Sequence, residues 1–245
     1  MISATNANQI SAARSDLAAA FRWAVRLGLS EGIENHFSLM VPGSTSQFLL
    51  NEYGLHWAEV RVSNLLTLDF NGRVLDGRGP PDMTAFHIHS RIHSRLPHAQ
   101  CVLHTHMPYA TALTTLENGR LEMCSQTALM VHHLVAYDDS YNGLALDSTE
   151  GDRMADMLGS KRALFLGGHG VVVIGRSVAE AFDLLYWLER ACQLQILALS
   201  TGRKLRVIPD TIVGGMRQQL EDSGMKSHFE ALKRMLYRDE PDFIT

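Results

Sequence analysis

The sequence predicts a single α/β or α+β domain over residues 1–245, because short strand-like runs alternate with helical segments along the chain. A length of 245 residues suits one large domain. Apolar residues make up 46% and charged residues 20%, an ordinary balance for a protein that buries its own core. No internal repeat, low-complexity segment or linker divides the chain.

The first half predicts one helix and several strands. Apolar residues recur near helical spacing from Gln9 to Leu29, and Gly28 stands where a helix would end. Two short runs follow, at 37–41 and 47–50, separated by a Pro-Gly pair. Residues 65–69 predict a strand that enters a tight Asn-Gly turn and returns through 74–75.

The second half predicts the remaining strands and the longest helices. Strands are expected at 100–106, 163–166 and 171–174. Helices are expected at 84–95, after Pro108, at 178–200 and at 212–236, the last within a helical tail from about residue 205. Ser177 is the expected N-cap of the 178–200 helix, with Glu180 at the capping-box position.

The bulk properties exclude several classes of partner. A net charge of −4 gives no basic surface, so neither nucleic acid nor an anionic membrane is an expected partner. No stretch approaches the ~18 apolar residues of a membrane span. The three cysteines are scattered, and the N-terminus has no secretory pattern. A cytoplasmic protein with a small-molecule substrate is the expectation.

The histidines carry the chemical signal. Six of the twelve lie between His87 and His106. His104 and His106 flank one residue of an expected strand, so their side chains share a face with Cα atoms about 6.5–7 Å apart. Two imidazoles at that spacing can share an ion, and His169 between two glycines is the best third ligand. Taken alone, such a pair is more often a core or surface feature.

Two other groups of histidines allow a second interpretation. His89 and His93 lie four residues apart on one expected helix face, a spacing that also binds metals. We interpret them instead as polar helix residues near a pocket. His36 follows a helix end, where loops often carry binding groups.

Taken in order, these segments resemble the class II aldolase/adducin family, from the first helix through Ser200. The resemblance rests on five segments: Asn35-His36-Phe37-Ser38, Leu49-Leu50-Asn51-Glu52-Tyr53-Gly54, Thr84 to His89, Arg95 to His106 and Gly168-His169-Gly170. The tail, at 232–236, resembles the adducin-like bacterial branch.

The resemblance implies a three-layer α/β/α fold with a central, mainly antiparallel mixed sheet. It implies one divalent metal per chain on His104, His106 and His169, most often Zn²⁺, with Fe²⁺ or another transition metal as the alternative. It also implies a homotetramer with the site near a subunit boundary. In the family's sugar-phosphate aldolases, the metal polarises a carbonyl and an acidic residue transfers a proton.

The sequence departs from that aldolase pattern at several positions. Ala85 stands at the position of the family's acid, and Asp82 is the candidate catalytic replacement, with a helix N-cap as its alternative role. The resemblance assigns substrate binding to Asn35 and His36, which replace a Gly-Asn phosphate-binding pair, and to Gly54, Thr84 and Gln126. Gln126 falls near a tyrosine that acts from the neighbouring subunit.

Three functions fit this pattern. The first is a metal-dependent lyase that performs retro-aldol cleavage or decarboxylation of a hydroxy-acid, oxo-acid or sugar-type substrate. Decarboxylation needs no base to remove a hydroxyl proton, which suits the missing acid. The second is a non-catalytic, adducin-like binding or assembly module. The third is a non-haem iron oxygenase, since three imidazoles can hold Fe²⁺ with open positions.

Overall fold

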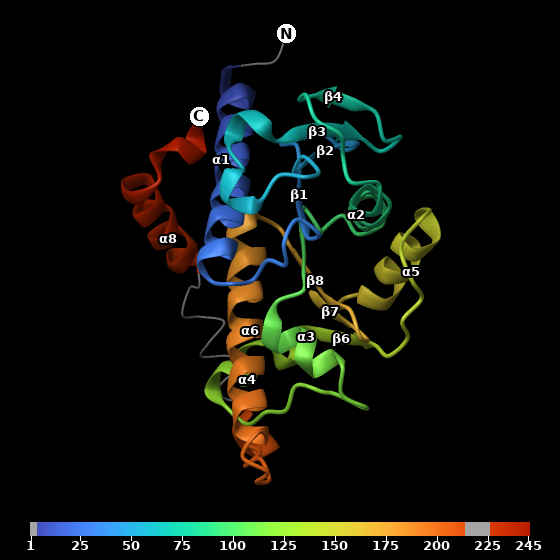
Figure 1. Ribbon diagram of the computed structural model, residues 1–245, viewed down its shortest axis with the longest axis vertical. Coiled ribbons are helices and arrows are strands. Elements are labelled where there is room, and N and C mark those ends of the chain that lie inside the picture. The colour runs from blue at the N-terminus through green and yellow to red at the C-terminus, as the bar shows by residue number, and fades with distance from the viewer. Residues whose placement is uncertain (1–3, 214–225) are drawn as a thin grey trace.

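The computed structural model describes residues 4–213 and 226–245, and its centre is one eight-stranded sheet. The strand order is β4-β3-β2-β1-β5-β8-β7-β6 (Figure 1). Every pairing is antiparallel except that of β6 with β7, which is parallel. The expected mainly antiparallel mixed sheet is therefore confirmed.

The strands and helices have the following bounds. The strands are β1 His36–Met40, β2 Gln47–Leu50, β3 Leu66–Asp69, β4 Val74–Asp76, β5 Cys101–Thr105, β6 Val135–Asp138, β7 Ala163–Leu166 and β8 Gly170–Gly175. The α-helices are α1 Ala4–Arg26, α2 Met83–Arg95, α3 Pro108–Thr114, α4 Gln126–Val131, α5 Ser148–Leu158, α6 Val178–Leu199 and α8 Lys226–Asp239. Short 3-10 helices lie at Trp57–Glu59, Val62–Asn64, His132–Leu134 and Pro241–Ile244.

Helices cover both faces of the sheet, which confirms the three-layer α/β/α architecture. Figure 1 shows α1, α6 and α8 on one side of the strands, and α2 and α5 on the other. The larger apolar core lies under α1 and α6, where Phe21, Phe37 and Phe182 are fully buried. Smaller cores under α2 and α5 gather around Ile92 and Phe48.

The alternation of side chains along β1 and β5 decides which groups reach the α2 side. Phe37 of β1 and Leu103 of β5 belong to the core under α1 and α6. Their neighbours His36 and His104, which are paired Cα to Cα across the two strands, point to the opposite face. The α2 side of the sheet centre therefore carries imidazoles beside apolar side chains such as Val102 of β5.

Most boundaries agree with the expectations, and local chemistry explains several of them. Gly28 adopts a positive φ of 67° just after α1, as a helix-ending residue should. Ser177 caps α6 by accepting from the Glu180 amide. The expected 100–106 strand is one correction, because β5 ends at Thr105, whose hydroxyl accepts from the Met107 amide.

Three elements between residues 126 and 158 had no expectation: α4, β6 and α5. In the tail, α8 packs against α1 and α6, with Lys233 paired to Asp16 at 2.7 Å. The rest of the expected 212–236 helix includes residues 214–225, which lie outside the described part of the chain. Within residues 4–213 and 226–245, none of the helices combines the length and apolar composition needed to cross a bilayer.

Candidate metal centre

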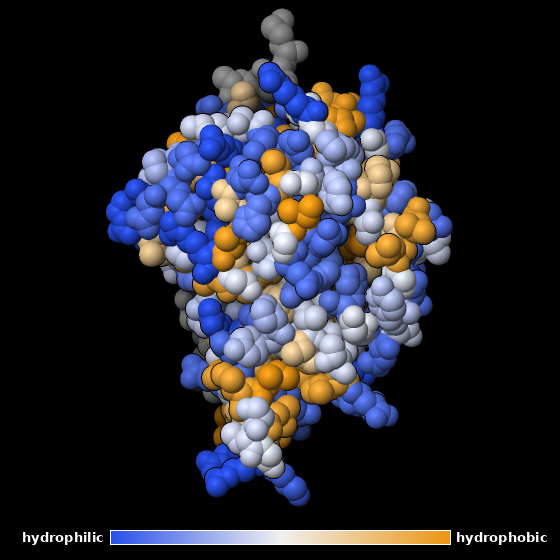
Figure 2. All heavy atoms as spheres, in the orientation of Figure 1, coloured by the Kyte–Doolittle hydropathy of each residue, from blue (hydrophilic) through white to orange (hydrophobic). Residues whose placement is uncertain are grey.

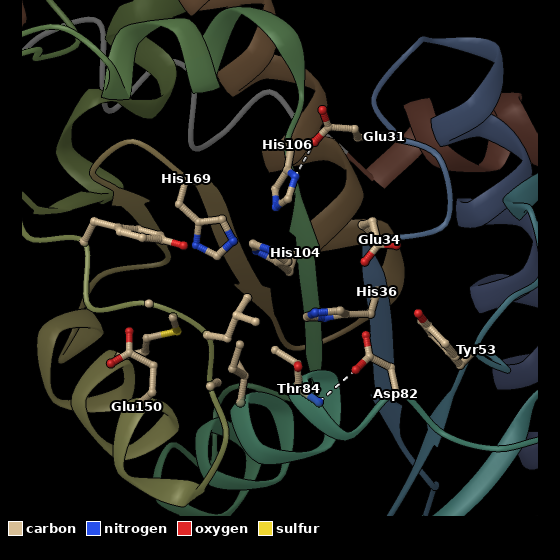
Figure 3. A pocket seen from close by; sticks show the side chains of 16 residues that line it. Glu31, Glu34, His36, Tyr53, Asp82, Thr84, His104, His106, Glu150 and His169 are labelled. Carbon is tan, nitrogen blue, oxygen red and sulfur yellow. Dashed lines mark hydrogen bonds and ion pairs between the residues drawn. The ribbon is translucent and has the colours of Figure 1, made fainter.

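Three histidines from separate segments converge at one point. His104 lies on β5, His106 follows the end of that strand, and His169 lies in the turn before β8. Each offers a ring nitrogen, and these three atoms lie within 4.8 Å of one another. Figure 3 shows the three rings facing a common space. The structure thus brings together the three residues proposed as metal ligands.

The far side of two of these rings is fixed by hydrogen bonds. His104 Nδ1 donates to the carbonyl oxygen of Val171 at 3.0 Å. His106 Nδ1 lies 2.5 Å from a carboxylate oxygen of Glu31, which can only accept. Both rings therefore carry hydrogen on Nδ1 and turn Nε2 to the common space, and in the neutral form of either ring that Nε2 has a free lone pair. A carboxylate or carbonyl behind a histidine is the usual support of a metal ligand.

His106 Nε2 is the strongest indication that this space takes an ion. It is buried, yet it makes no hydrogen bond with any of the described residues. Buried polar atoms are almost always partnered, because leaving one without a partner costs free energy. A neutral imidazole nitrogen can bind a divalent cation through its lone pair, so the residues present fit a metal.

Burial also keeps two of these imidazoles, those of His104 and His169, in the neutral form that binds metals. It lowers the pKa of His169 to about 4 and holds the pKa of His104 well below the ordinary histidine value. Nearby histidines lower the pKa of both further. A metal would therefore not have to displace protons from these two rings at neutral pH.

The loop after α1 holds the Glu31 carboxylate in place. The side-chain oxygen of Asn35 accepts from the Glu31 amide at 2.8 Å and from the His106 amide at 3.4 Å. The Asn35 carbonyl oxygen accepts from the Trp57 indole at 3.2 Å. Asn35 is 1% exposed and ties the loop to the end of β5.

The histidines open into a pocket of about 400 Å³. One wall comes from the α1–β1 loop and the start of α2, and the opposite wall from residues 141–145 and α5 (Figure 3). Its carboxylates are Glu31, Glu34, Asp82 and Glu150. The apolar part includes Ile88, Leu144 and Met154. Such a mixed, concave site suits a small polar molecule.

The carboxylates of the pocket are not equally available. Glu31 is paired with His106, and Glu150 with Arg153 at 2.6 Å. Asp82 is the N-cap of α2, with Oδ1 accepting from the amides of Thr84 and Ala85. Asp82 thus has the alternative capping role while its side chain also lies on the pocket wall.

The residues proposed for substrate binding divide into two groups. His36 and Thr84 line the pocket. Asn35 lies behind the wall, and neither Gly54, next to the lining residue Tyr53, nor Gln126, exposed at the start of α4, is among the lining residues. Ala85 is fully buried in the apolar core under α2, so its side chain packs against that core and does not line the pocket.

Sequence reasoning did not find Glu31, Glu34, Glu150 or the 141–145 segment. The first two carried a weak signal, because they lie in the loop that precedes the binding candidate His36. Glu150 and the 141–145 segment had none, since their approach depends on how α5 packs against α2.

Comparison with known proteins places this geometry in a family context. A family model described as "Class II Aldolase and Adducin N-terminal domain" matches residues 15–196. A crystal structure of an aldolase II superfamily protein from Pseudomonas syringae has a TM-score of 0.90 at 34% identity, covering 97% of this chain and 96% of that one. Alpha-adducin from Rattus norvegicus is 35% identical over 194 residues, which are 77% of this chain and 26% of that protein.

A third neighbour supports the fold alone. The L-fuculose 1-phosphate aldolase from Glaciozyma antarctica PI12 has a TM-score of 0.86, covering 98% of this chain and 95% of that chain. Its sequence identity is only 22%.

The Glu31–His106 pair yields a direct prediction. Glu31→Ala removes the acceptor that orients His106, so the affinity for Zn²⁺ should fall about 10- to 100-fold. Glu34→Ala is the matched control, since it removes another carboxylate of the same pocket that is not bonded to a candidate ligand. Competition with a chelator of known affinity measures both. Equal losses in the two variants would show that only the charge of the pocket matters.

Proposed function

Because the chain belongs to the class II aldolase and adducin family, we propose that it is a divalent-metal-dependent lyase. Its substrate would be a small hydroxy-acid, oxo-acid or sugar-type molecule, cleaved by a retro-aldol step or by decarboxylation. The observation that carries the proposal is the buried His106 Nε2, which bonds none of the described residues and lies beside His104 and His169 in the pocket wall. A binding module without chemistry has no use for such a site.

The ion is proposed to be Zn²⁺, one per chain, held by His104, His106 and His169. Three imidazoles also suit Fe²⁺, so the choice of zinc rests on the family resemblance and the ligand set does not decide between the two metals. A bound divalent ion would supply a Lewis acid that polarises a carbonyl oxygen and stabilises negative charge developing on it.

The chain's own residues would position the substrate and move its proton. We assign proton transfer to Asp82, because Oδ1 caps α2 while the carboxylate still borders the pocket. Thr84 and His36 lie on the same wall and would contact substrate hydroxyl groups. Asn35, Gly54 and Gln126 remain proposed as substrate-binding residues, and Gln126 is proposed to act in the site of a neighbouring subunit.

The proposal predicts turnover that depends on both metal and Asp82. Zinc-loaded protein should cleave a member of a panel of oxo-acids, hydroxy-acids, sugars and sugar phosphates, and chelation should abolish the activity. Asp82→Asn should lower kcat about 10²- to 10⁴-fold, because the amide can still cap α2 but cannot transfer a proton. Asp147→Asn is the control, since Asp147 caps α5 in the same way but lies outside the pocket wall.

Stoichiometric metal with no turnover across that panel would contradict the lyase. It would favour the second candidate, an adducin-like binding or assembly module. The specific observation for that alternative is the 35% identity to alpha-adducin over 194 residues.

We further propose that the chain forms a homotetramer in the cytoplasm. The support is an apolar surface at the end of α6, where Leu194, Leu197 and Leu199 are 49%, 52% and 38% exposed. Figure 2 shows apolar residues gathered toward the lower end of the molecule, the end where Figure 1 places the last turns of α6. Exposed apolar surface of this kind marks protein contacts.

Light scattering tests the assembly. The native protein should have the mass of four chains, and Leu194→Glu combined with Leu197→Glu should give smaller species, because buried charges oppose the contact. A native protein with the mass of one chain would contradict the tetramer.

A further inference from the structure

Behind the metal centre, polar side chains of β1 and α2 form a continuous buried chain. His36 and Ser38 point from β1 toward α2, where they contact the side chains of His89 and His93. His36, Ser38, His89 and His93 are 3%, 0%, 0% and 5% exposed. None of them belongs to the group proposed to hold the metal.

The hydrogen bonds run from the pocket to a backbone carbonyl. His36 Nδ1 lies 2.7 Å from His89 Nε2. His89 Nδ1 lies 2.5 Å from the Ser38 hydroxyl, which lies 2.8 Å from His93 Nε2. His93 Nδ1 lies 2.6 Å from the Ala99 carbonyl oxygen. Each ring nitrogen of His89 and His93 is thereby used.

The fixed end of this chain determines the position of every hydrogen. The Ala99 carbonyl can only accept, so His93 carries its hydrogen on Nδ1 and its Nε2 must accept. The Ser38 hydroxyl therefore donates to His93 and accepts from His89 Nδ1. That leaves His89 Nε2 as an acceptor, and its donor is His36 Nδ1.

The rings in this argument are neutral. Burial lowers the pKa of His93 to about 4 and holds the pKa of His89 well below the ordinary value, and the buried His36 ring is hydrogen-bonded to this neutral His89. Each neutral ring has one N–H and one bare nitrogen, so reversing any bond would set two lone pairs against each other.

The free end of the chain is His36 Nε2. The His36 side chain lines the pocket, and Figure 3 shows its ring pointing inward beside His104 and near Thr84. The ring centroids of His36 and His104 are 4.7 Å apart. His36 does not belong to the three residues whose ligand atoms lie within 4.8 Å of one another, so its nitrogen is available to something beside the ion.

We propose that the chain His36–His89–Ser38–His93 fixes His36 as a hydrogen-bond acceptor that selects a hydroxyl group of the substrate next to the metal. A hydroxyl can donate to the bare Nε2, whereas a phosphate or carboxylate oxygen there would meet a second lone pair. The substrate class is then a hydroxy compound whose anionic group, if it has one, lies elsewhere. The substrate half of this proposal rests on the proposed function, and the arrangement of hydrogens does not.

Nitrogen NMR tests the arrangement of hydrogens without any turnover. In zinc-loaded protein labelled with ¹⁵N-histidine, two-bond ¹H–¹⁵N spectra should show His36 with a protonated Nδ1 and a bare Nε2. The signals are assigned by their loss in His36→Phe. Ser38→Ala should remove this preference and give a mixture of tautomers, because the His89 Nδ1 hydrogen loses its acceptor. Ser90→Ala, which removes a buried hydroxyl of α2 that is not part of the His36–His89–Ser38–His93 chain, should leave the spectrum unchanged.

Two outcomes would overturn the arrangement. One is a His36 that carries its hydrogen on Nε2 in the native protein. The other is a folded Ser38→Ala variant with an unchanged His36 spectrum. If Ser38→Ala does not fold, the native spectrum decides alone.

A matched pair of chelators tests the substrate half. Glycolohydroxamate and acetohydroxamate bind zinc through the same group and differ by one hydroxyl. His36→Phe should lower the affinity for glycolohydroxamate about five- to tenfold, the size of one hydrogen bond, and leave the affinity for acetohydroxamate unchanged. Equal effects on both would overturn the hydroxyl selection. Binding of neither by the native protein would contradict the metal site and hence the substrate half, while the NMR result stands separately.

Discussion

The antiparallel pairing of β1 with β5 is the constraint on which the pocket depends. It places His36 directly opposite His104, so two imidazoles from distant parts of the sequence share one face of the sheet centre. The same alternation sends Phe37 and Leu103 into the core under α1 and α6. A shift of one residue in this register would put the histidines into the apolar core, which makes the register strongly specified.

Burying so many polar rings is costly unless each finds a partner. Two of them rest on backbone carbonyls, His104 on Val171 and His93 on Ala99. These two contacts, together with the Glu31 carboxylate behind His106, orient the bare nitrogens toward the pocket. The core packing, the tautomers and the candidate metal centre are therefore parts of one hydrogen-bonded arrangement. The candidate ligands differ from the supporting rings in geometry, because the ligand atoms of His104, His106 and His169 converge within 4.8 Å of one another.

Much of this fold is readable from the sequence, because apolar periodicity and turn residues mark the longer elements. The 163–166 strand has the expected bounds, and α6 begins at Val178 as expected. The pairing of His104 with His169 rested on resemblance, since spacing alone favours ordinary core histidines. The short elements α4, β6 and α5 and the roles of Glu31 and Glu150 escaped prediction, because they depend on tertiary contacts. His89 and His93 lie on α2 as expected, but their connection through Ser38 depends on how α2 packs against β1.

The proposed lyase function requires that the three converging histidines hold an ion. The most direct measurement is elemental analysis of protein purified without a metal-affinity column, alongside His169→Ala. The account predicts about one zinc per chain in the native protein and its loss in the variant, with the fold retained. Iron in place of zinc would favour the non-haem iron oxygenase over the lyase. No metal even after anaerobic purification and titration with zinc would contradict the account and leave the pocket as a binding surface.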